Sequence, residues 1–165
     1  MDSRTPELDS LYRDVLLDHY RSPRGRTEVP APDVVNEGQN PLCGDEVRVA
    51  VKLAADTLDR IHVHGKGCSI SVASGSMMAE LVAGKSMGQA EKLIAVVKDL
   101  MHGKPLPEGL ETGDLDALQG VQKFPVRVKC ALLPWMTLED ALRARRQGQV
   151  HPTAPTSTET GGEAP

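Results

Sequence analysis

The sequence predicts an α+β domain, built from a small, mostly antiparallel three-stranded sheet with helices packed on one face. Two observations support this prediction. Between residues 46 and 65, apolar side chains alternate with polar ones, which is the pattern of half-buried strands. Before and after that region, apolar residues recur every three or four positions, which is typical of amphipathic helices.

The N-terminal half of the chain predicts one helix followed by three strands. Residues 7–20 place their apolar side chains on one helical face, and the Pro and Gly at 23 and 25 end the helix. A short strand over 34–38 leads into a turn around Cys43. Residues 46–53 and 58–65 then form an antiparallel hairpin, and three strands are about the fewest that are stable under a helical layer.

The C-terminal half predicts three helices and one long irregular segment. Helices are expected from Cys68 to Gly84 and over 86–102. Residues 103–124 are rich in Pro and Gly, with one weak helical turn near 115–118, and long segments of this kind are usually functional. A last helix over 126–146 contains Pro134, which is expected either to kink the helix or to start its second part.

The composition indicates one globular domain, over residues 1–146, and a disordered tail over 147–165 that packs on nothing. The formal net charge is −4 and aromatic residues make up 2%, which argues against a nucleic-acid partner. No apolar run is long enough for a membrane span, and the N-terminus lacks a secretory signal. A cytoplasmic location is therefore expected.

The three cysteines, Cys43, Cys68 and Cys130, are the residues that indicate a functional site. Cys43 lies in a polar turn with Asp45 two residues later, Cys68 at a strand-to-helix junction, and Cys130 after Arg127 and a lysine. An odd number of cysteines and no signal peptide argue against a disulfide framework. Three thiolates and one carboxylate would make the four ligands of a tetrahedral zinc site.

The residues alone leave this metal site undecided. The cysteines are 25 and 62 residues apart, which matches no short zinc-binding pattern, and a lone cysteine is more often a small buried apolar residue. His62 and His64 share a strand face, but without a third ligand nearby they are expected to be a solvent-facing pair. His19 is expected to pack or hydrogen-bond near the end of the first helix.

Four motifs resolve the choice by resemblance. Residues 11–20 with Pro23 and Arg24, residues 40–45, residues 65–71 and residues 127–135 resemble, in this order, the U-type iron–sulfur scaffold proteins. Lysine stands at position 129, directly before the third cysteine, where the IscU branch of that family carries histidine. Together with the insertion over 103–124, this lysine makes the chain similar to the SufU branch.

The resemblance implies a zinc ion on Cys43, Asp45, Cys68 and Cys130, at one edge of the sheet. It also implies a SufS-like, pyridoxal-phosphate-dependent cysteine desulfurase as partner, with Cys43 accepting persulfide sulfur and Arg127 contacting the site or that partner. Two alternatives stay open. The same ligands could hold iron or a [2Fe–2S] cluster that is assembled and passed on, or zinc could serve only to stabilise the fold.

Overall fold

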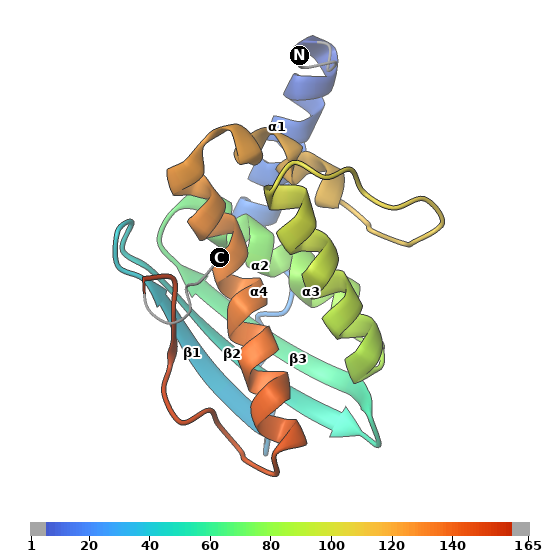
Figure 1. The fold of residues 1–165 in the computed structure, drawn as a ribbon, viewed down its shortest axis with the longest axis vertical. Coiled ribbons are helices and arrows are strands. Elements are labelled where there is room, and N and C mark those ends of the chain that lie inside the picture. Colours follow the sequence, from blue (N-terminus) through green and yellow to red (C-terminus); the bar gives the residue numbers. More distant parts are fainter. Residues whose placement is uncertain (1–5, 160–165) are drawn as a thin grey trace.

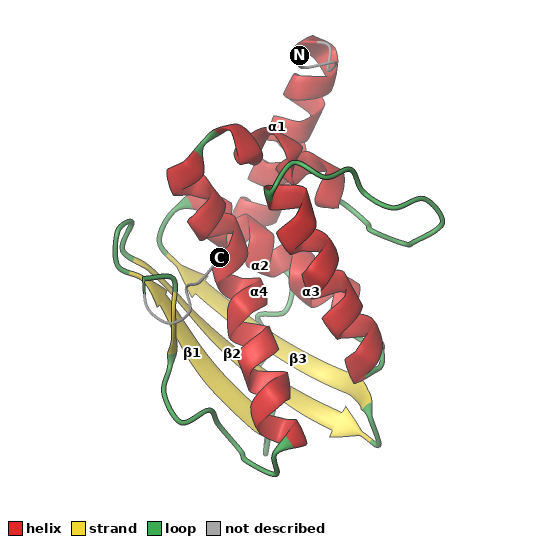
Figure 2. Cartoon of the chain, viewed as in Figure 1, coloured by secondary structure: helices red, strands yellow, loops and turns green. Residues whose placement is uncertain are grey.

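The structure, a computed structural model, describes residues 6–159 and has a layer of helices on one face of a sheet (Figures 1 and 2). The predicted helices and strands are all present, within a few residues of the expected bounds. In chain order the elements are α1 (Pro6–Arg21), β1 (Val34–Asn40), β2 (Asp45–Ala54), β3 (Thr57–Lys66), α2 (Ser69–Val82), α3 (Met87–Met101), the 3₁₀ helix η1 (Leu115–Lys123), α4 (Pro125–Arg146) and β4 (Thr156–Ser157).

The sheet has four strands in the order β3-β2-β1-β4, so the expected three-stranded sheet is wrong by one strand. The pairs β1–β2 and β2–β3 are antiparallel, as predicted, whereas β4 runs parallel to β1. The additional strand comes from the tail that was expected to pack on nothing. That expectation is therefore wrong for residues 156 and 157, while residues 160–165 lie outside the described part of the chain.

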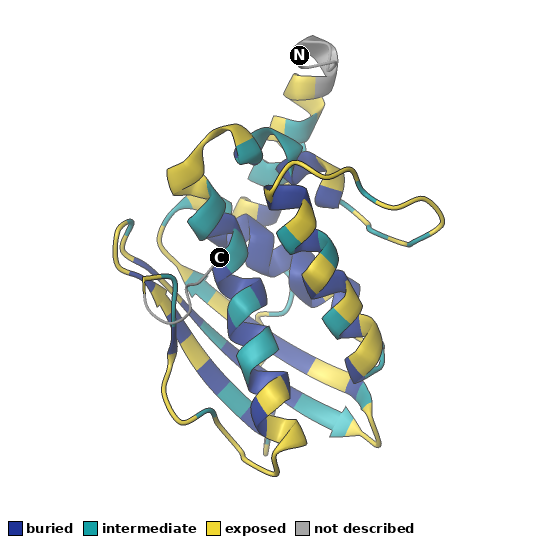
Figure 3. Cartoon of the chain, in the orientation of Figure 1, coloured by how far each residue is buried: buried dark blue, intermediate teal, exposed yellow. Residues whose placement is uncertain are grey.

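The buried residues gather between the sheet and the helices (Figure 3). The side chains of this core are almost entirely aliphatic. Alternate residues of β2, such as Val47, Val49 and Val51, face this core, which explains the alternation seen in the sequence. Trp135 is fully buried, and its indole N–H donates to the hydroxyl of Ser74 at 2.9 Å. Burial of these side chains provides most of the energy that holds the two layers together.

Helix α4 extends unbroken from Pro125 to Arg146, with Pro134 inside it. Of the two expectations for Pro134, a restart of the helix is therefore wrong. Proline cannot donate a backbone hydrogen bond to the carbonyl four residues earlier, which here belongs to Cys130. The chain continues as a helix because the residues on both sides of Pro134 are buried against the sheet and α2.

His19 fixes the segment between α3 and α4 to the rest of the domain. Its ring is fully buried, with Nδ1 2.7 Å from the Ser76 hydroxyl and Nε2 2.7 Å from a carboxylate oxygen of Asp114. Asp114 directly precedes η1, which extends the single weak turn expected there to nine residues. One side chain thus joins α1, α2 and the irregular segment 103–124.

Replacing His19 with alanine should lower the free energy of unfolding by about 2–4 kcal/mol, because it leaves a buried cavity and removes one buried and one partly buried hydrogen bond. Urea unfolding of the metal-free protein, followed by circular dichroism, measures this change. His102→Ala is the control, since His102 is exposed and its ring contacts the Lys98 carbonyl at the surface. Equal unfolding energies for the two variants would contradict the role assigned to His19.

Candidate metal centre

The four side chains named as ligands from the sequence lie together at one end of the sheet. Cys43 is on the β1–β2 turn, Asp45 begins β2, Cys68 directly precedes α2, and Cys130 is near the start of α4. Ligand atoms of Cys43, Asp45 and Cys130 all lie within 4.8 Å of one another. The Cys68 sulfur is 3.7 Å from Oδ2 of Asp45, and all three cysteines are free thiols.

One carboxylate oxygen of Asp45 accepts a backbone hydrogen bond, and the other oxygen faces the cysteine sulfurs. Its side chain is buried, and Oδ1 accepts a hydrogen bond of 2.8 Å from the backbone N–H of Cys68. That N–H is at the start of α2, where the helix dipole favours a negative charge. Oδ2 lies toward the Cys68 thiol and is thereby placed to act as a ligand.

Gly67 leaves the space that Asp45 occupies. Its φ of +132° is one that residues with a side chain rarely adopt, and a Cβ at this position would lie 2.4 Å from Oδ1 of Asp45. The glycine before Cys68 therefore has a function beyond turning the chain from β3 into α2. It allows the carboxylate to reach the backbone of Cys68.

Asn40 is a component of the site that was not singled out from the sequence. It is fully buried, and its Nδ2 donates to Oδ2 of Asp45 at 3.3 Å and to the Cys130 sulfur at 3.5 Å. Its backbone carbonyl accepts from the N–H groups of Cys43 and Gly44. The only signal in the sequence was its place beside Pro41, which an ordinary turn residue also explains.

The cluster of three thiols and one carboxylate would need a compensating cation if its thiols were ionised. Burial raises the pKa of the Cys130 thiol far above its ordinary value, and its contacts with Asp45, Cys43 and Cys68 raise this pKa further. Thiolates gathered around the buried Asp45 carboxylate would repel one another and this carboxylate without a compensating charge. Three sulfurs and one oxygen form a donor set that suits zinc, so the residues present fit the metal that the sequence implied.

Among the four candidates, Cys43 is the one best placed to react with another molecule. It is half-buried, between the exposed residues Leu42 and Gly44, on a turn of four residues. A Cβ added at Gly44 would meet nothing within 4 Å, so the space around this part of the turn is open. Cys130, in contrast, is fully buried on a helix and cannot move without disturbing its neighbours.

Arg127 and Lys129 flank the site on the first turns of α4. Arg127 is exposed and lines a groove with residues of α1 and with Ser69 at the start of α2. Lys129 forms an ion pair of 2.6 Å with Glu159. Arg127 is therefore beside the site and open to a partner, and its expected role stays a prediction.

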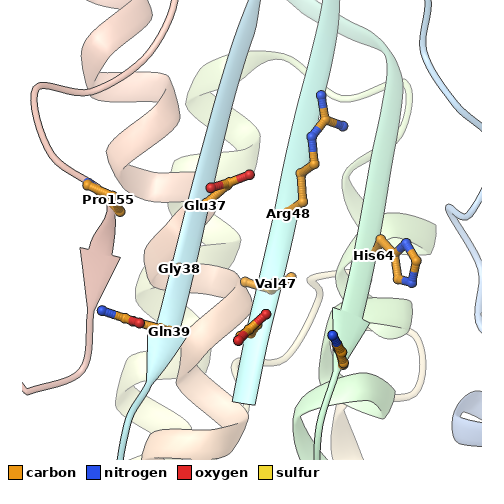
Figure 4. A pocket seen from close by; sticks show the side chains of 9 residues that line it. Glu37, Gly38, Gln39, Val47, Arg48, His64 and Pro155 are labelled. Atoms are coloured by element: carbon orange, nitrogen blue, oxygen red, sulfur yellow. The ribbon is translucent and has the colours of Figure 1, made fainter. Parts of the chain in front are cut away.

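Two other polar groups are separate from this centre. The expected solvent-facing pair of histidines is wrong for His62, which is buried with Nδ1 3.1 Å from the Thr27 carbonyl, while His64 is exposed. The connector before β1 covers His62. A hollow on the open face of the sheet, lined by side chains such as Glu37, Arg48 and His64, contains none of the cysteines (Figure 4).

Comparisons with known proteins identify the family to which the chain is similar. The profile of the NifU-like N-terminal domain matches residues 11–131. The zinc-dependent sulfurtransferase SufU of Bacillus subtilis is 43% identical over 141 residues, which cover 86% of this chain and 95% of that protein. The iron–sulfur cluster assembly scaffold protein IscU of Streptococcus pyogenes is 36% identical, covering 87% and 89% of the two chains.

The fold is also similar to that of solved structures. A crystal structure of a SUF-system protein from Fervidobacterium islandicum superposes with a TM-score of 0.74 at 33% identity, covering 78% of this chain and 94% of that one. Within residues 6–159, no helix has both the length and the apolar composition needed to cross a bilayer.

The close approach of Gly67 and Asp45 gives a test of the site. Gly67→Ala should weaken zinc binding by at least about tenfold, because the added methyl group displaces the carboxylate from its backbone hydrogen bond. Competition with a chromophoric chelator measures the affinity. The matched control is Gly84→Ala, since Gly84 also has a positive φ, of +81°, but has open space around it. If both variants bind zinc equally well, Asp45 is not held as described.

Proposed function

Because the chain belongs to the NifU-like N-terminal domain family, we propose that it is a zinc-dependent sulfur acceptor in iron–sulfur cluster assembly. In this proposal Cys43 takes sulfur from the persulfide of a pyridoxal-phosphate-dependent cysteine desulfurase. The supporting observation is that the Cys43 and Cys130 thiols converge with the buried Asp45 carboxylate and that the Cys68 sulfur is 3.7 Å from the same carboxylate. Of these four side chains, only Cys43 is on an open turn.

Cys43, Asp45, Cys68 and Cys130 would hold the zinc ion. When bound, zinc keeps the coordinated thiols deprotonated, and it compensates the charge of the buried Asp45. Cys68 and Cys130 are fixed at the starts of helices, and Asp45 is fixed by the N–H of Cys68. Cys43 is therefore the ligand that can leave with least disturbance of the fold, and a partner side chain, by family analogy a histidine, would take its place.

The sulfur transfer is a substitution at sulfur. The Cys43 thiolate attacks the outer sulfur of the desulfurase persulfide, a new S–S bond forms on Cys43, and the S–S bond of the partner breaks. The partner cysteine leaves as a thiolate, so that charge and oxidation state balance as in thiol–disulfide exchange. No further oxidant or reductant is needed for this step.

A second candidate function is a scaffold that carries a [2Fe–2S] cluster on the same four ligands. The relative named as an IscU scaffold favours it, and so does the sulfur-rich donor set. Lys129, whose ammonium group is paired with Glu159, does not supply a further ligand. Metal analysis of protein from iron-rich, zinc-poor medium separates the two candidates, because a scaffold should retain iron and the sulfur acceptor should retain zinc.

The third alternative is a zinc ion that only stabilises the fold. Turnover of the desulfurase distinguishes this alternative, because a structural zinc module would not accelerate cysteine consumption. A sulfur acceptor would accelerate it at catalytic concentrations of the desulfurase.

Replacing Cys43 with alanine should abolish persulfide formation and desulfurase stimulation while leaving most of the fold intact. Its side chain is on an exposed turn, whereas Cys68 and Cys130 are anchored beside the core. Mass spectrometry after reaction with the desulfurase locates the persulfide in the wild type. Cys130→Ala is the comparison, and it should lower the melting temperature more than Cys43→Ala does. Persulfide found on Cys130 in the wild type would overturn the assignment of Cys43 as acceptor.

Arg127 is proposed to contact the desulfurase, since it is exposed beside the site on a groove shared with α1 and α2. Arg127→Ala should raise the apparent KM for this protein in the desulfurase assay several-fold, with zinc content and melting temperature unchanged. Arg143→Ala is a matched control, because Arg143 is an exposed arginine near the other end of α4. Equal KM values for the two variants would remove Arg127 from the interface.

A further inference from the structure

The segment after α4 returns along the sheet to the candidate metal centre. Gly148 turns the chain with a φ of +78°, and the Val35 N–H donates to the Val150 carbonyl. The chain then runs beside β1 toward the turn that carries Cys43 (Figure 1). Figure 4 shows Pro155 and β4 beside β1 at this position. These residues lie beyond residue 131, where the match to the family profile ends.

Thr156 fastens this segment to the domain. Its side chain is buried, its hydroxyl accepts from the Asn36 amide at 2.9 Å, and the same hydroxyl donates to a carboxylate oxygen of Asp140 at 2.5 Å. The Thr158 N–H donates to the Gln39 carbonyl at 3.1 Å and continues the pairing with β1. The segment is thus held by specific buried contacts and not only by proximity.

Its last described residues contact the supports of the metal ligands. The Thr158 hydroxyl donates to Oδ1 of Asn40 at 3.0 Å, and the amide group of the same Asn40 contacts Asp45 and Cys130. The Glu159 carboxylate pairs with the ammonium group of Lys129, next to Cys130. Thr158 and Glu159 therefore contact two residues that support the candidate ligands, Asn40 and Lys129.

Of the two contacts, the Thr158–Asn40 hydrogen bond should affect Cys43 more than the Lys129–Glu159 ion pair does. The main-chain carbonyl of Asn40 accepts hydrogen bonds from the N–H groups of Cys43 and Gly44, so the residue whose side chain Thr158 contacts also begins the Cys43 turn. When Thr158 occupies Oδ1, the Asn40 amide is directed toward Asp45 and Cys130. The Lys129–Glu159 pair is partly exposed, and such pairs contribute little to stability, so its effect should be local.

We propose that residues 156–159 form a strap that restrains ligand exchange at Cys43, with Thr158 and Glu159 as positioning residues. The strap keeps Asn40 and Lys129 in place, and thereby keeps the Cys43 turn closed against Asp45 and Cys130. Loosening the strap makes Cys43 easier to release and easier to reach. This inference rests on the proposed metal centre, and it adds a part of the chain that the family profile does not include.

Thr158→Val tests the strap, because valine keeps the shape of the side chain and removes the hydroxyl donor. Thr153→Val is the matched control, since Thr153 is an exposed threonine of the same segment. Loss of the hydrogen bond should accelerate zinc transfer to a chelator by about two- to tenfold relative to this control. In metal-free protein, alkylation of Cys43 by iodoacetamide, located by mass spectrometry, should accelerate by a similar factor.

Two further variants complete the experiment. Glu159→Gln should accelerate zinc transfer less than Thr158→Val does, and a chain ending at Pro155 should accelerate it most. Metal-free Thr158→Val should still unfold in one transition, with a lower melting temperature than Thr153→Val, because Oδ1 of the buried Asn40 loses its hydrogen-bond donor. If Thr158→Val and Thr153→Val lose zinc and react with iodoacetamide at the same rates, the strap is refuted, whether or not the shortened chain folds.

These measurements do not involve a desulfurase, so they separate this inference from the proposed function. Faster zinc transfer and alkylation in the strap variants, without desulfurase stimulation by the wild type, would support the strap and contradict the sulfur-acceptor function. Normal stimulation with unchanged exchange rates would contradict only the strap.

Discussion

The hydrogen bond from the backbone N–H of Cys68 to the Asp45 carboxylate is the interaction on which the site depends. It joins the first residue of β2 to the residue that precedes α2. The two meet because β2 and β3 pair with Glu46 opposite Lys66, which brings the end of β3 beside the start of β2. A slip of one residue in this register would move Asp45 away from Cys68 and would also expose the valines of β2. The core of the sheet and the geometry of the site are therefore fixed by the same pairing.

This constraint divides the four candidate ligands into fixed and movable ones. Asp45 and Cys68 hold each other, and Cys130 is fully buried on α4. Cys43 is connected to the site through the short turn that begins at Asn40. A metal site with three fixed ligands and one movable ligand suits a protein that must both protect a thiolate and present it. A site meant only to stabilise the fold would gain nothing from a movable ligand.

Most of the fold was predictable because it depends on local patterns. Alternation of apolar residues located β2 and β3, and helical periodicity located α1, α2 and α3. The prediction of the fold failed where a segment makes contacts with residues far away in the sequence, because local composition does not reveal such contacts. Thr156–Ser157 forms a strand because Thr156 reaches Asn36 and Asp140. His62 is buried because the distant residue Thr27 covers it.

The sequence by itself determined the family, the α+β class and the identity of the four candidate ligands, since each cysteine is embedded in a recognisable local motif. The tertiary structure alone decided that Asn40 connects these ligands, that Gly67 must lack a side chain to admit Asp45, and that the tail returns to the site. The physical reason is that a sequence motif specifies only which residues are neighbours along the chain. The distances between the candidate ligands depend on strand register and on the packing of α4, which no single segment encodes.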